Sequence, residues 1–98
     1  PELMDAVKKC MTYKLEINDY LDMMAIWYRD VLIYKATKNV DRVVFSDQLR
    51  YIKARASKSS YEGIEKILEA LETAKARMKA NVNFELVIEL LLLTIKEN

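Results

Sequence analysis

Apolar residues recur at spacings of three and four along most of the chain, and this periodicity predicts a series of amphipathic helices. The first spans about Glu2–Met11, and Pro1 fits its first turn. A heptad seam continues past this segment, so the helix either stops near Thr12 or runs on; we favour a break between Thr12 and Leu15. The repeating apolar residues are Leu3, Met4, Val7 and Met11.

A stronger pattern predicts a second helix over about Leu15–Ala36. Arg29 and Asp30 interrupt its apolar surface, and since adjacent residues point in different directions on a helix, they cannot pair well with each other. An unpaired charge in apolar surroundings is costly, so each is expected to find a partner on another helix or chain. The apolar face comprises Ile17, Tyr20, Leu21, Met24, Tyr28, Val31 and Leu32. Three further residues widen it into a candidate interface: Met23, Trp27 and Tyr34.

The middle of the chain predicts a loop followed by a short helix. Residues Thr37–Phe45 are polar and then apolar, and the last three are expected to pack on the core as an extended piece. Ser46 is expected to cap a third helix that ends near Ala56. The residues of this helix expected to face inward are Leu49, Ile52 and, as an open alternative, Tyr51.

Ser59 and Glu62 have the spacing of a capping box, which opens a fourth helix of about 20 residues. Gly63 in its first turn is unfavourable for a helix. Either this position frays, which we prefer, or another helix approaches it closely. The buried stripe is expected to comprise Ile64, Ile67, Leu68, Leu71, Ala74 and Met78.

The most apolar segment is the last, Asn83–Ile95, which has only two charges, Glu85 and Glu89. Asn81 is expected to shape the tight corner before it, and Asn83 its N-cap. A helix apolar on all sides is expected to be buried on all sides, by its own bundle or by a neighbouring subunit. Glu89 is expected to anchor a buried hydrogen bond or ion pair, preferably with Arg29.

Composition supports a single all-α domain over residues 1–98, a compact bundle of about five helices. Hydrophobic residues make up 52% of the chain, whereas one Gly and one Pro are too few for a sheet-rich fold. The lone Cys10 predicts a reducing, cytoplasmic location, and no membrane segment is apparent. Because the chain opens on Pro1 rather than Met, we interpret it as a fragment of a longer subunit.

The residues that are missing restrict the chemistry more than those present. Without His there is no Ser-His-Asp triad and no zinc site with imidazole ligands, and one Gly cannot form a Gly-rich phosphate loop. We therefore predict no catalytic residues, no cofactor and no metal site. Glu65 and Glu69, four residues apart, are interpreted as a solvated helix face.

Charge is uneven along the chain although the net charge is only +1. Residues 37–58 contain six basic and two acidic residues. A solvated helix face explains this better than phosphate binding, because dedicated nucleic-acid binders have a larger basic footprint. The alternative remains a small helical nucleic-acid-binding module that uses Arg50, Lys53, Arg55 and Lys58.

Two segments, in their order and spacing, resemble a known family. They are Trp27-Tyr28-Arg29-Asp30-Val31-Leu32-Ile33-Tyr34-Lys35, and Asn81-Val82-Asn83 leading into Leu86-Val87-Ile88-Glu89-Leu90-Leu91-Leu92. Together they are similar to the C-terminal collar domain of the delta prime subunits of bacterial DNA polymerase III, in the clamp-loader family. The related gamma/tau subunits usually have Pro where Val82 stands, which favours delta prime.

The resemblance implies a role in DNA replication without catalysis. Clamp loaders are five-subunit assemblies whose AAA-type modules, absent here, sense ATP and DNA, while the helical collar domains hold the ring together. It implies gamma/tau and delta as direct partners. The sliding clamp and primed DNA are reached only indirectly, through the full complex.

Overall fold

The computed structural model describes residues 14–98, with side chains from Glu16 onward. This part contains four α-helices: α2 (Lys14–Thr37), α3 (Leu49–Lys58), α4 (Tyr61–Lys79) and α5 (Phe84–Glu97). Two 3-10 turns, η1 (Val40–Arg42) and η2 (Ser46–Gln48), lie between α2 and α3. The all-α prediction is confirmed, and the second predicted helix is found within one residue of its expected ends. The predicted first helix, Glu2–Met11, lies outside the described residues.

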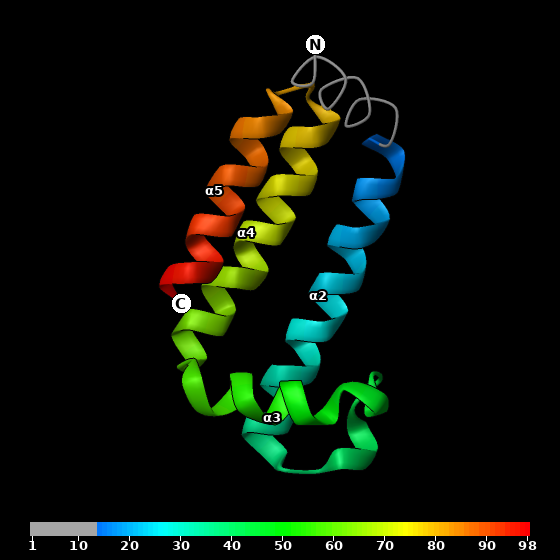
Figure 1. Ribbon diagram of the computed structural model, residues 1–98, viewed down its shortest axis with the longest axis vertical. Helices are drawn as coiled ribbons and strands as arrows, with labels where there is room; N and C mark the ends of the chain where they lie inside the picture. Colours follow the sequence, from blue (N-terminus) through cyan, green and yellow to red (C-terminus); the bar gives the residue numbers. More distant parts are fainter. Residues whose placement is uncertain (1–13) are drawn as a thin grey trace.

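Three long helices lie side by side, each antiparallel to the next along the chain, and the short α3 crosses one end of them (Figure 1). Helix α4 is central, because it packs against α2 on one side and α5 on the other, whereas α3 packs mainly against α2. The molecule is elongated, with extents of 47 × 25 × 23 Å.

Among residues 14–98 the core contains two clusters of buried residues. The larger joins α2, α4 and α5 and comprises Leu21, Ala25, Tyr28, Ile67, Leu71, Ala74, Met78, Val87 and Leu91. The smaller joins α2, α3 and α4 and comprises Val31, Ile52, Ala56 and Ile64. Trp27 and Leu68 pack against both clusters, so the core is continuous from one end of the described bundle to the other. Every residue of the predicted α4 stripe is buried except Leu68, which is half-buried.

The start of α3 differs from the prediction. Ser46 does not cap it: η2 takes up that residue, and the N-cap of α3 is Gln48, whose side chain makes no capping hydrogen bond. The extra turn forms because the Gln48 backbone N–H donates to the Phe45 carbonyl, 2.9 Å away. Of the residues expected to face inward, Ile52 is buried, Leu49 is half-buried and Tyr51 is 59% exposed.

Helix α4 begins one residue later than predicted. Ser60, not Ser59, is its N-cap, and its hydroxyl accepts the Gly63 N–H at 2.9 Å. Gly63 is buried, and a Cβ there would lie only 3.1 Å from the Asn98 carbonyl oxygen. Close approach by the end of α5, the less favoured alternative, therefore explains the glycine.

The corner between α4 and α5 has the predicted form. Asn81 adopts the left-handed conformation, with φ 57°, and its N–H donates to the Met78 carbonyl. The Val82 N–H donates to the Arg77 carbonyl at 3.1 Å, which completes a Schellman motif. The Asn83 side chain then caps α5 by accepting the Leu86 N–H at 3.0 Å, as expected.

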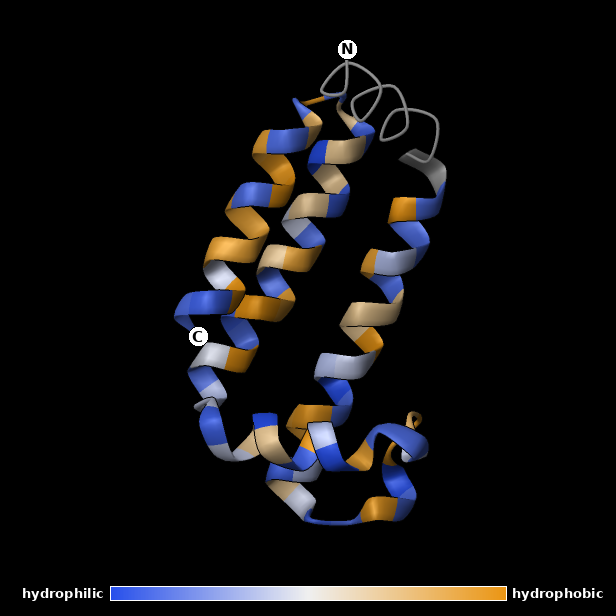
Figure 2. Cartoon of the chain, in the orientation of Figure 1, coloured by the Kyte–Doolittle hydropathy of each residue, from blue (hydrophilic) through white to orange (hydrophobic). Residues whose placement is uncertain are grey.

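Helix α5 is not buried on all sides within the part of the chain that the structure describes. Only Val87 and Leu91 are buried, because α4 is its main neighbour in the described residues and covers one side of it. Hydrophobic residues nevertheless extend around the helix (Figure 2). No described helix is both long and apolar enough to cross a membrane.

Candidate protein interface

The three candidate interface residues of α2 differ in how much surface they present. Met23 is 51% exposed, whereas Trp27 and Tyr34 are half-buried. Trp27 packs edge-to-face on Tyr28, with ring centroids 5.0 Å apart, and the Tyr34 ring packs against the smaller cluster. Trp27 and Tyr34 therefore have structural roles as well as any contact they make with a partner.

Asp30 is almost completely buried, at 1% exposure, and its partner is a loop rather than another charged side chain. One carboxylate oxygen accepts the Val44 N–H at 2.9 Å and the other accepts the Phe45 N–H at 2.8 Å. The loop from η1 to η2 is thereby tied to α2, with Val43 buried and Phe45 half-buried on the core. The expectation that this loop end packs on the core is confirmed for these two residues, whereas Val44 is 70% exposed.

The preferred pairing of Arg29 with Glu89 does not form within this chain. Both side chains are exposed, and every ion pair among the described residues involves Lys75, with Asp22 and Glu72. The reason is the layout of the bundle: α4 lies between α2 and α5, and Glu89 is on the side of α5 that faces away from α4. The Asp22 carboxylate, through a hydrogen bond, raises the pKa of Lys75.

The four basic residues of the α3 region do not form one free patch. Arg55 donates from a guanidinium nitrogen to the Ile95 carbonyl, at 2.9 Å, and lies over the Tyr28 ring. Burial raises the pKa of Tyr28, and the charge of Arg55 partly offsets this rise. Lys53 is exposed but lies 5.8 Å from the Tyr34 ring, and Arg50 and Lys58 are also exposed.

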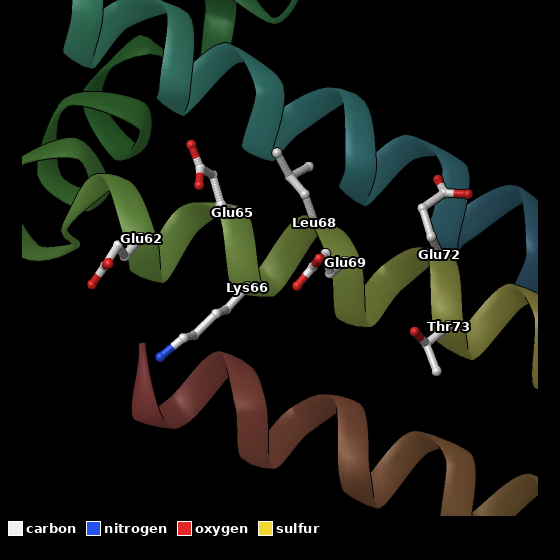
Figure 3. A pocket seen from close by; sticks show the side chains of 7 residues that line it. All are labelled: Glu62, Glu65, Lys66, Leu68, Glu69, Glu72 and Thr73. Atoms are coloured by element: carbon white, nitrogen blue, oxygen red, sulfur yellow. The ribbon is translucent and has the colours of Figure 1, made fainter.

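A groove of about 930 Å³ follows the exposed side of α4 (Figure 3). Four glutamates line it, including Glu65 and Glu69, whose predicted solvated position is confirmed. Among the described residues no group of acidic or sulfur side chains is arranged to hold a metal ion.

Helix α5 has an exposed apolar surface. Leu86, Leu90 and Leu93 are 47%, 39% and 51% exposed, and their spacings of four and three place them in one stripe. Beside Leu90 a smaller groove of about 210 Å³ separates α5 from α4. Ala70, Thr73, Ala74 and Arg77 line its α4 side, and the first three of these side chains are small.

Comparison with known proteins places this arrangement in a family. Residues 3–97 match the family described as DNA polymerase III, delta subunit, C terminal. The chain belongs to this family. It is also similar to the DNA polymerase III subunit delta' of Bacillus subtilis (strain 168), with 34% identity over 77 residues, which are 79% of this chain and 23% of that protein. No solved structure matches the chain.

Membership of the DNA polymerase III delta C-terminal family confirms the resemblance found in the sequence. The chain corresponds to less than a quarter of the length of its Bacillus relative. Sequence reasoning identified α5 as over-apolar but missed the groove beside it. The available signal was the recurrence of the small residues Ala70, Thr73 and Ala74 at helical spacing on α4.

Proposed function

We propose that this chain is a scaffold domain in the collar of a DNA polymerase III clamp loader. It would pack against the collar domains of the gamma/tau and delta subunits and so hold the ring together while the ATP-driven loader places the sliding clamp on primed DNA. In this proposal the domain has no active site of its own. It reaches the clamp and DNA only through the full complex, in the cytoplasm.

The observation that carries this proposal is the row of half-exposed leucines on α5. Full burial of a leucine side chain stabilises a protein by roughly 1.5–3 kcal/mol, and a half-exposed leucine gains only part of this free energy. A contiguous patch of such side chains is typical of a protein-interaction surface. Family membership supports a partner within the replication machinery.

A second apolar surface lies on another helix. Met23 and Tyr20 of α2 are 51% and 63% exposed, and α4 lies between them and α5. A domain seated between two neighbours in a ring needs two such surfaces. We propose that the Met23 side, with the exposed edges of Trp27 and Tyr34, contacts one neighbour and α5 contacts the other.

Reconstitution tests the proposal. The complete subunit containing this chain should co-elute with purified gamma/tau and delta subunits in size-exclusion chromatography, and the same subunit without residues 1–98 should not. Met23→Glu is a better interface variant than a change at Trp27, because Trp27 packs against both core clusters. Assembly that is unchanged without the domain would rule out the collar role.

The alternative function, nucleic-acid binding by the basic residues of α3, is weakened because Arg55 is committed to the Ile95 carbonyl. Titration with single-stranded and duplex DNA at two salt concentrations distinguishes the two functions, because phosphate-driven binding weakens steeply as salt rises. We expect no salt-sensitive binding by the domain.

A further inference from the structure

We propose that the leucine stripe of α5 (Leu86, Leu90 and Leu93) binds one amphipathic helix from a neighbouring subunit. That helix would present its own apolar stripe to the leucines and basic side chains along one flank. The inference rests on the proposed function and adds to it the surface and the chemistry of the partner.

The geometry of the stripe suits a helix. Side chains at spacings of four and three form the seam through which two helices pack. The adjoining groove is lined on α4 by Ala70 and Thr73, and small residues there leave room for a large apolar side chain of the partner. The stripe and the groove together therefore offer a ridge and a recess, which is the arrangement that helix packing requires.

The charges beside the stripe define the partner. Glu85 and Glu89, four residues apart, follow its outer flank, are exposed, and form no ion pair within the described residues; the exposed Lys96 lies on the same flank two turns beyond Glu89, so the flank is acidic at the start of α5 and basic at its end. Arg77 lies on the other flank, on the α4 side of the groove. A helix with basic residues facing the two glutamates and an acidic residue near Arg77 would complement both flanks, as flanking charges set partner and orientation in helix pairs.

A second copy of this chain fits the stripe less well. The stripe continues one turn beyond Leu93 into Glu97, which is exposed. An antiparallel copy sets Glu97 of one chain against Leu86 of the other, and a parallel copy sets the two Glu97 side chains together. Either arrangement places a carboxylate in the apolar seam, and this is costly.

The α5 helix supplies its own control for the test. Leu92 is 55% exposed, against 51% for Leu93, but it lies outside the stripe, three residues after Glu89 on the glutamate flank. The uncharged variants Leu90→Asn, Leu93→Asn and Leu92→Asn, which leave the charge of this flank unchanged, are therefore compared in the complete subunit, by measuring its affinity for the gamma/tau and delta subunits. Circular dichroism of each variant verifies its fold.

We expect Leu90→Asn and Leu93→Asn to weaken assembly at least about tenfold, as central contacts of an interface do, and Leu92→Asn to change it by no more than about twofold. Equal effects of Leu92→Asn and Leu93→Asn, or none from Leu90→Asn and Leu93→Asn, would overturn the assignment of the stripe. If the unmodified subunit does not assemble at all, the proposed function falls, and this inference with it.

The charge of the partner is tested separately. Glu89→Lys should weaken assembly and reduce its dependence on salt, since attraction between exposed charges is screened by ions. Glu65→Lys is the matched control, because Glu65 lies on the part of α4 near α2, away from α5 (Figure 3). If Glu89→Lys leaves assembly unchanged or strengthens it, the partner is not basic on that flank. A subunit that dimerises alone, and that Leu93→Asn makes monomeric, would show that the occupant is a second copy.

Discussion

At the scale of single residues, Ser59 and Ser60 illustrate how a position one residue away changes a side chain's role. Both have a hydroxyl that can cap α4, and the capping-box spacing favoured Ser59. In the structure Ser60 is the cap, whereas Ser59 is 2% exposed and its backbone N–H donates to the Arg55 carbonyl at the end of α3. The tight α3–α4 connection thus uses one serine to end a helix and the next to begin another.

The two serines give a paired prediction. Ser60→Ala should lower the free energy of unfolding by about 1 kcal/mol, the usual value of an N-cap hydroxyl. Ser59→Ala should be close to neutral, because its buried Oγ has no protein hydrogen-bond partner among the described residues. Urea denaturation of both variants measures these changes. If Ser59→Ala lowers the free energy of unfolding more than Ser60→Ala does, Ser60 is not the residue that caps α4.

At the scale of elements, one side chain of α3 makes a hydrogen bond to the end of α5. Arg55 spans from the middle of α3 to the Ile95 carbonyl in the last turn of α5, and its guanidinium lies 5.6 Å from the Tyr28 ring of α2. A cation near the end of a helix also interacts favourably with the helix dipole. One arginine therefore links three helices that are distant in the sequence.

Arg55→Ala should consequently destabilise the domain by about 2 kcal/mol, from the lost charged hydrogen bond and cation–π contact. The exposed Arg50 is the control, and Arg50→Ala should cost less than about 0.5 kcal/mol. A second measurement is local: without the guanidinium charge the pKa of Tyr28 should rise further, which absorbance titration of the tyrosines detects. Equal stability losses for the two arginines would contradict the linking role.

At the scale of the whole molecule, Trp27 and Leu68 determine whether the two core clusters behave as one unit. Both side chains pack against each cluster, so loosening either cluster removes contacts from the residues that they share. Small domains with one continuous core usually unfold in a single step. The described bundle is expected to do so despite its elongated shape.

This cooperativity can be measured with the single tryptophan as a probe. Leu21→Ala in the larger cluster and Ile64→Ala in the smaller one should each cost about 2–5 kcal/mol, because both side chains are fully buried. In each variant, Trp27 fluorescence and helical circular dichroism should report the same unfolding midpoint. Separate midpoints would mean that the clusters unfold independently.

The sequence by itself determined the helical class, the approximate ends of α2 and the buried stripe of α4, through the spacing of its hydrophobic residues. It also determined the corner at Asn81 and the N-cap at Asn83, through the chemistry of asparagine. These features depend on residues within a few turns of one another, so local chemistry is enough to predict them. The match of the Trp27 and Asn81 segments to a known family likewise needed only the order of residues.

Only the tertiary structure decided which side of α5 is covered, that Asp30 holds a loop, that Arg55 binds the last turn of a distant helix, and that Gly63 makes room for Asn98. Each depends on which helices become neighbours. Apolar side chains on every side of a helix, or a charged residue without a local partner, do not show in advance which helix will be the neighbour. The stripe of Leu86, Leu90 and Leu93 is a surface because α4 covers the opposite side of α5, a choice made by the packing of the bundle as a whole.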